Sequence, residues 1–134
     1  MAITFTSPNI CTIGASLDDL DEDTIAIGEM RLGPLGRALI MGANRGIIRV
    51  YAEKATGVLL GATLVAERGE NLAHLIAWCI SEKMTVPQIL RKPFYHPTME
   101  EALQGALRDV LHKLDLKWEL SDAPPDLAVL SQEQ

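Results

Sequence analysis

A histidine and a glutamate late in the chain have the residue types and the spacing for acid–base chemistry. They lie in the segment Tyr95-His96-Pro97-Thr98-Met99-Glu100-Glu101. If Glu101 lies in the first turn of a helix, its carboxylate can fold back onto His96 and hold one ring nitrogen. Such a pair keeps the ring oriented, selects one tautomer and stabilises the imidazolium form, which suits a base that accepts a proton from a thiol. His96 and Glu101 are therefore candidate catalytic residues.

The same segment also has a purely structural interpretation. Thr98 and Glu101 have the spacing of a capping box, in which a hydroxyl and a carboxylate each bind a free backbone amide at a helix start. Two acidic residues in the first turn would also complement the helix dipole. This interpretation does not explain His96, whose bond to Pro97 is a candidate for the cis form. From these residues alone both interpretations stay open.

Composition favours one domain that binds neither nucleic acid nor a membrane. The chain has 134 residues, 48% of them hydrophobic, and a formal net charge of -6. The length and the hydrophobic content are enough for one hydrophobic core. The negative net charge would repel phosphate backbones and anionic lipid headgroups. There is no basic stretch followed by an apolar run at the start and no segment apolar enough to span a bilayer. We expect a cytoplasmic protein.

The cysteines and histidines do not form a recognisable metal or redox motif. Cys11 and Cys79 are far apart and lack CxxC spacing, so we expect two buried free thiols. A metal site built from His74, His96 and His112 is an alternative, but its spacing matches no known ligand pattern, and we predict no metal.

The hydrophobic pattern predicts an α+β fold. Alternation with a period of two, broken by Gly-containing turns, predicts an antiparallel meander of strands at residues 3–13, 24–32, 37–41, 46–53 and 58–66. Ser16 is placed to cap a short helical turn between the first two strands. Within the meander Ile48, Val50 and Ala52 should face the core, whereas Tyr51 should lie on a mixed opposite face.

After the strands the period changes to that of helices, which we expect to cover the sheet. The pattern predicts helices at residues 71–83, 86–91 and 98–114, with Thr98 opening the last one. The helix at residues 71–83 is apolar on several sides, which suggests that a second subunit covers part of it. Residues 115–134 lack periodicity and are expected to be a tail outside the domain of residues 1–114, loosely packed or disordered.

The His96-Pro97-Thr98 motif with Glu101 resembles the active-site signature of the class I pyridine nucleotide-disulfide oxidoreductases, the family of dihydrolipoamide dehydrogenase and glutathione reductase. The similarity extends over residues 3 to about 114. It is carried by Phe5-Thr6-Ser7-Pro8-Asn9-Ile10 with Ile13-Gly14, by Gly36-Arg37-Ala38 with Gly46-Ile47-Ile48-Arg49-Val50, by Thr56-Gly57 to Leu60-Gly61-Ala62, and by Gly69-Glu70-Asn71-Leu72. The chain is similar to the C-terminal dimerisation domain of these enzymes.

The resemblance implies a role for each residue of the motif. His96 would be the general base and Glu101 the carboxylate that orients it, acting across a homodimer interface on the disulfide and flavin of the partner subunit. The His96-Pro97 backbone would approach the partner's isoalloxazine ring. The parent enzyme would use FAD and NAD(P), bound by its remaining domains.

Two departures limit what the chain can do alone. It has no Gly-rich dinucleotide fingerprint after a strand and no redox-active cysteine pair. We therefore expect a domain of a longer enzyme that is inactive in isolation and binds neither cofactor by itself. Around Phe94-Tyr95 the chain is more similar to dihydrolipoamide-dehydrogenase-like proteins than to mercuric or glutathione reductases. The alternative is a stand-alone dimeric binding or scaffold protein that kept this fold without catalysis.

Overall fold

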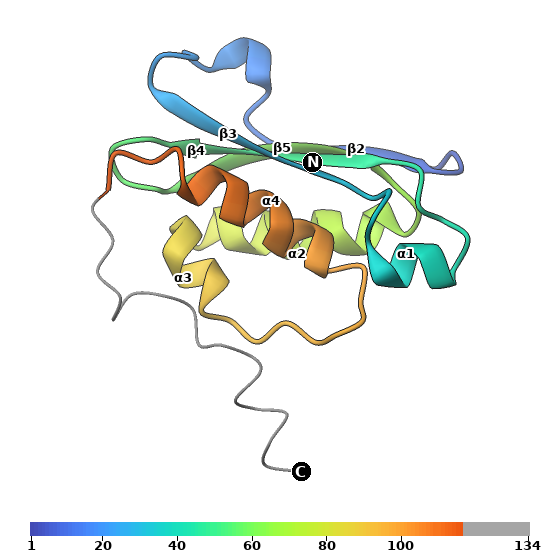
Figure 1. The fold of residues 1–134 in the computed structure, drawn as a ribbon. Helices are drawn as coiled ribbons and strands as arrows, with labels where there is room; N and C mark the ends of the chain where they lie inside the picture. Colours follow the sequence, from blue (N-terminus) through green and yellow to red (C-terminus); the bar gives the residue numbers. More distant parts are fainter. Residues whose placement is uncertain (117–134) are drawn as a thin grey trace, which may run out of the picture.

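The computed structural model describes residues 1–116 and shows a five-stranded antiparallel sheet with helices packed against one face (Figure 1). The strand order is β1-β2-β5-β4-β3, so β3, β4 and β5 form the predicted meander and β2 returns to pair with β5. The elements are β1 (Ala2–Thr4), β2 (Asn9–Gly14), the 3-10 helix η1 (Leu17–Asp19), β3 (Ile25–Arg31), α1 (Gly36–Ile40), β4 (Ile47–Glu53), β5 (Leu59–Ala66), α2 (Gly69–Ser81), α3 (Val86–Leu90) and α4 (Glu101–Leu111). The predicted α+β class is confirmed.

The inward face of β4, which lies between β5 and β3, is the one that the alternation predicts. Ile48, Val50 and Ala52 are each 0% exposed. Tyr51 points to the other face but is also buried, and its hydroxyl donates to Thr63 Oγ1 at 3.1 Å. The segment that contains η1 lies on the side of the sheet opposite the helices (Figure 1).

Close approach of α4 to β3 depends on a glycine. A Cβ placed on Gly28 would lie 2.2 Å from the backbone oxygen of Ala106, closer than atoms can pack. On its sheet-facing side α4 buries the apolar stripe that the period of 3.6 predicts. That stripe contains Ala102, Leu103, Ala106, Leu107 and Val110. The helix that carries Glu101 is therefore held against the two strands β3 and β4.

The strand predicted at residues 37–41 is wrong, because this segment forms helix α1. Strands β3 and β4 pair directly with each other, so the residues between them only connect the two strands. Arg, Ala and Leu are good helix formers. Of the apolar side chains here only Ala38 is buried, while Leu39 and Ile40 are 54% and 67% exposed, so no alternating strand face is available.

The N-terminal prediction is also corrected, because residues 3–13 form two strands. β1 and β2 pair antiparallel around a turn in which Asn9 Nδ2 donates to the carbonyl of Thr6 at 2.9 Å. Ser16 precedes the predicted short turn, η1, but its side chain makes no capping hydrogen bond. Cys11 is buried as expected, whereas Cys79 is only partly buried. Residues 117–134 of the expected tail lie outside the described residues.

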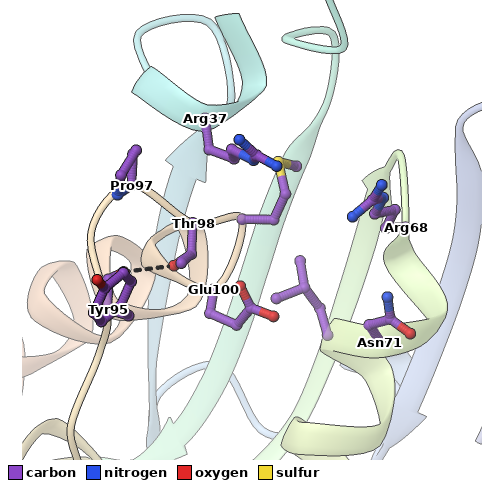
Figure 2. Close-up of a pocket in the computed structure, with 9 residues that line it drawn as sticks. Arg37, Arg68, Asn71, Tyr95, Pro97, Thr98 and Glu100 are labelled. Carbon is purple, nitrogen blue, oxygen red and sulfur yellow. Dashed lines mark hydrogen bonds between the residues drawn. The ribbon is translucent and has the colours of Figure 1, made fainter. Parts of the chain in front are cut away.

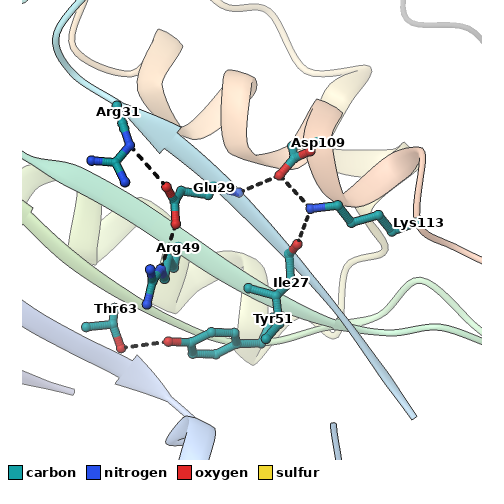
Figure 3. A network of polar contacts seen from close by, with 8 residues as sticks. All are labelled: Ile27, Glu29, Arg31, Arg49, Tyr51, Thr63, Asp109 and Lys113. Atoms are coloured by element: carbon teal, nitrogen blue, oxygen red, sulfur yellow. Dashed lines mark hydrogen bonds and ion pairs between the residues drawn. The ribbon is translucent and has the colours of Figure 1, made fainter. Parts of the chain in front are cut away.

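A polar network fixes the far end of α4 to the edge strand β3 (Figure 3). Asp109 Oδ2 accepts from the backbone N–H of Glu29 at 2.9 Å and from Lys113 Nζ at 2.8 Å. Lys113 also donates to the carbonyl of Ile27 at 2.8 Å, and the Glu29 carboxylate pairs with Arg49 Nε at 2.8 Å. These contacts satisfy backbone groups that an edge strand leaves unpaired.

The network shifts the titration of Asp109. Desolvation by burial raises the pKa of this carboxyl, but the hydrogen bonds from Lys113 and from the backbone of Glu29, with the nearby positive charges of Lys113 and His112, outweigh it. The net effect is a pKa below the ordinary value of 3.8. A carboxyl with a lowered folded-state pKa stabilises the fold above its unfolded-state pKa, and this contribution is lost as the pH falls through the folded-state pKa.

We predict that Asp109→Asn lowers the free energy of unfolding at pH 7 by roughly 0.5–1 kcal/mol, a value reduced for the exposure of the ion pair. Between about pH 5 and pH 3 the variant should lose less stability than the parent chain, because the titrating group is gone. Urea unfolding at a series of pH values measures both effects. Asp18→Asn, in exposed η1, is the matched control, and equal acid dependence of all three proteins would contradict the prediction.

Candidate functional site

The loop between α3 and α4 follows a capped helix and is held by two apolar anchors. Thr85 and Gln88 form a capping box at the start of α3, with hydrogen bonds of 2.9 and 3.4 Å. Later in the sequence, Met99 is buried in the hydrophobic core, and the partly buried Phe94 packs against the same core. Between these anchors Tyr95 is 82% exposed. The anchored chain thus presents the Tyr95-His96-Pro97 tip to the outside.

At this tip His96 and Glu101 make the contact that their spacing predicts. His96 Nδ1 lies 2.9 Å from Glu101 Oε1, and the His96 side chain is 76% exposed while that of Glu101 is 22% exposed. The other carboxylate oxygen, Oε2, accepts from the backbone N–H of Thr98 at 2.9 Å. The His96-Pro97 bond, a candidate for the cis form from its sequence, is cis. One carboxylate therefore binds both the ring and the backbone of the loop.

This geometry assigns the proton on the imidazole. An ionised carboxylate only accepts hydrogen bonds, so Nδ1 must carry the hydrogen that it shares with Glu101. In the neutral ring, Nε2 is then the nitrogen with a free lone pair. Because the ring is largely exposed, Nε2 can accept a proton from a group that approaches from outside the domain. A held ring with one free nitrogen is the arrangement of a general base.

The predicted capping box is only half present, and the helix starts later than expected. Glu101 binds the Thr98 amide, but the Thr98 hydroxyl points back and donates to the carbonyl of Tyr95 at 2.7 Å. α4 begins at Glu101 and not at Thr98. Since the hydroxyl closes the His96 loop, Thr98 contributes to the shape of the loop more than to the start of the helix.

A hollow of about 400 Å³ lies beside the loop (Figure 2). Arg37 from α1 and Arg68, directly before α2, both line it, and so does Glu100. Its lining is completed by Asn71, Leu72, Tyr95, Pro97, Thr98 and Met99. The sequence pattern does not indicate this pair of arginines, because it predicts a strand at residues 37–41.

The remaining candidate residues do not join the site. His74 is exposed on α2, where its Nδ1 lies 2.7 Å from the Glu70 carbonyl, and His112 ends α4. Within residues 1–116 no three His, Cys, Asp or Glu side chains are grouped to hold a metal ion. Within the same residues, no helix is both long and apolar enough to cross a membrane.

The two cysteines have little thiolate character. Burial raises the pKa of Cys11, and the negative charge of Glu70 raises it further. Burial also raises the pKa of Cys79 despite the opposing positive charge of Lys92. Because the thiolate is the reactive form, neither cysteine is prepared for disulfide exchange.

Comparison with known proteins gives consistent matches. The family described as "Pyridine nucleotide-disulphide oxidoreductase, dimerisation domain" matches residues 1–107. The dihydrolipoyl dehydrogenase of Haloferax volcanii is 32% identical over 120 residues, which cover 85% of this chain and 25% of that protein. The mercuric reductase of Streptomyces lividans is 36% identical over 108 residues, covering 78% of this chain and 22% of that protein.

Solved structures agree on the fold. LpdA from Mycobacterium tuberculosis matches with a TM-score of 0.74 at 23% identity, over 80% of this chain and 24% of that chain. The flavoprotein disulfide reductase RclA from Escherichia coli matches with the same TM-score of 0.74 at 18% identity. The chain thus spans about a quarter of the length of the relatives that it matches.

We predict that Glu101→Ala changes the tautomer of His96. In the parent chain the neutral ring should carry its hydrogen on Nδ1, and without the carboxylate the ring should become a mixture of both tautomers. The ¹⁵N chemical shifts of the two ring nitrogens measure this. Glu100→Ala removes the neighbouring carboxylate as a control and should leave the His96 shifts unchanged. Identical ring shifts in the parent chain and Glu101→Ala would show that Glu101 does not hold the ring.

Proposed function

The chain belongs to the dimerisation-domain family of the pyridine nucleotide-disulphide oxidoreductases, and we propose that it forms the twofold interface of a homodimeric, FAD- and NAD(P)-dependent disulfide oxidoreductase. Within that enzyme it supplies the acid–base pair His96 and Glu101 to the site of the partner subunit. The observation that carries this proposal is the exposed His96 ring, held through Nδ1 by Glu101, with no partner at Nε2 among residues 1–116. A scaffold protein would have no need of a ring oriented in this way.

The residues at the loop tip suit an approach to a flavin bound elsewhere. Tyr95, His96 and Pro97 are exposed and carry no fixed charge that would have to be buried, and the hollow beside them is open. When bound by the parent enzyme, FAD would accept an electron pair from a dithiol and exchange it with NAD(P). We assign no binding of either cofactor to this chain alone.

The chemistry of this chain is a proton transfer at His96 Nε2. The imidazole takes the proton of a substrate thiol, and the resulting thiolate is the nucleophile of thiol–disulfide exchange. Glu101 stabilises the positive ring that forms, through the Nδ1–H hydrogen bond. In the opposite direction the imidazolium returns the proton to a leaving thiolate. Since Cys11 and Cys79 are not activated, the exchanging cysteine pair belongs to another part of the enzyme.

For the substrate we propose a dithiol of the dihydrolipoamide class. The chain is 32% identical to a dihydrolipoyl dehydrogenase and 36% identical to a mercuric reductase, so overall identity does not separate these two activities. The preference rests on the similarity around Phe94-Tyr95-His96. This choice stays a prediction.

A second copy of the chain is the partner that the surface of α2 favours. Trp78 on this helix is 62% exposed, and next to it lies an apolar groove of about 430 Å³. The groove is lined mainly by apolar side chains, among them Leu75, Cys79, Ile89, Phe94 and Leu103. An apolar helix face beside an apolar groove is a surface that a soluble protein covers.

We predict that the 134-residue chain sediments as a dimer and that Trp78→Glu shifts it toward the monomer. A charge placed in an apolar contact costs far more than it does in solvent. Sedimentation velocity over a range of protein concentrations measures the distribution. Phe5→Glu is the matched control. Phe5 is an exposed aromatic residue like Trp78, with an exposed fraction of 76%, but it lies in the turn between β1 and β2. A parent chain that stays monomeric at every concentration would contradict the dimer.

The catalytic assignment can be tested in a chimera. The chain is placed in the Haloferax volcanii dihydrolipoyl dehydrogenase in exchange for the segment that it matches, and the rate of flavin reduction by dihydrolipoamide is followed by stopped-flow absorbance. We expect His96→Gln to slow this reduction by about 10²- to 10⁴-fold, the usual worth of a positioned base, while the flavin content stays unchanged.

The controls separate loss of the base from loss of the fold. Glu101→Ala should slow the reaction less than His96→Gln, because the ring remains but is no longer held. Glu100→Ala should leave the rate close to that of the parent chimera. If His96→Gln reduces its flavin as fast as the parent chimera, His96 has no part in the reaction.

A further inference from the structure

The apolar groove beside α2 is a surface separate from the one that Trp78 forms. Two of its lining residues, Ile89 from α3 and Leu103 from α4, are each only 2% exposed, whereas Leu75 and Cys79 from α2 are partly buried. Trp78, whose exposure indicates a second copy of the chain, does not line this groove of about 430 Å³. Contact through Trp78 therefore leaves the groove without an occupant, although an apolar surface of this kind favours one.

The described part of the chain ends next to a helix that lines the groove. Leu116, its last residue, packs over the turn between β4 and β5. A Cβ placed on Gly57 in this turn would lie 3.2 Å from Leu116 Cδ1 and 3.6 Å from Pro87 Cδ. Pro87 belongs to α3 and precedes the groove residue Ile89 by two positions. The chain thus continues beyond Leu116 from a point beside α3.

The sequence beyond Leu116 contains one segment whose chemistry matches the groove. Leu127-Ala128-Val129-Leu130 is the longest apolar run in residues 117–134. The ten residues before it, 117–126, span up to about 33 Å when extended, which is ample for a return to α3. Lys92 and Glu100 are the charged residues of the lining, and Asp126, directly before the run, has the charge that attracts Lys92.

We propose that the segment of residues 127–130 binds in the groove of its own chain and covers Cys79. Burial of its aliphatic side chains against the groove is favourable, and the short connection from Leu116 keeps the segment at a high local concentration. Phe94, one of the two anchors of the His96 loop, lines the same groove. The bound segment therefore also packs on this anchor and supports the loop from outside.

The experiment uses Cys79 as a reporter in the 134-residue chain. The rate of its alkylation by iodoacetamide is followed by mass spectrometry, which distinguishes it from Cys11, a residue that is 0% exposed. We expect Leu127→Asp and Leu130→Asp each to raise the Cys79 rate about tenfold, the ratio for a groove covered in roughly nine molecules out of ten. Ala123→Asp adds the same charge before the apolar run and should react like the parent chain.

Two results would overturn the inference. One is an equal alkylation rate of Cys79 in the parent chain and in both leucine variants. The other is protection of Cys79 that disappears on dilution of the parent chain, because a second copy would then be the occupant. Protection that stays constant on dilution is the expected result for a segment of the same chain.

The NMR signals of the Ile89 and Leu103 side chains provide a second measurement that does not depend on thiol chemistry. We expect Leu130→Asp to shift the methyl signals of both residues and Ala123→Asp to leave them in place. Methyl signals that are identical in the parent chain and Leu130→Asp would also reject the proposal. The inference does not depend on the role of His96, so either can fail while the other stands.

Discussion

The contact between His96 Nδ1 and Glu101 Oε1 is the interaction on which the rest of the site depends. The same carboxylate also binds the Thr98 amide, so the direction of the ring and the shape of the loop are set together. Glu101 can do this only because it opens α4, and α4 is fixed to the sheet along its whole length. Gly28 admits the helix close to β3, and Asp109 ties its far end to the same strand.

The loop between α3 and α4 is anchored in the core, while the His96 side chain at its tip is exposed. The loop is anchored by buried Met99 and by Phe94, yet its tip exposes His96 to solvent. Neither cysteine of this domain lies at the tip, so a thiol that gives its proton to His96 must come from elsewhere. An exposed imidazole on a rigid support, next to an apolar α2 face, is the arrangement to expect if, as we propose, the reacting groups belong to a second subunit. Burial raises the pKa values of the buried Cys11 and of the partly buried Cys79, so neither thiol is prepared for that chemistry.

Much of the fold followed from periodicity, and the exceptions have physical causes. Alternation located β3, β4 and β5, and the 3.6-residue period located α2, α3 and α4, since each buries one stripe of apolar side chains. Periodicity failed at α1, because five residues are too few to distinguish a helical turn from a short strand. At the site, spacing predicted the His96–Glu101 contact. It could not predict that Thr98 binds the Tyr95 carbonyl or that Arg37 and Arg68 share a hollow, because tertiary packing brings these groups together.

The most direct test of the central claim, that His96 serves the partner subunit, uses mixed dimers of the chimeric enzyme. Subunits carrying His96→Gln are combined with subunits whose flavin domain lacks a redox-active cysteine, and the activity of the mixture is compared with that of each parent. If His96 acts across the interface, mixed dimers contain one complete site, and the mixture should be far more active than either parent. A mixture no more active than its parents, with mixed dimers demonstrated by mass spectrometry, would contradict the account.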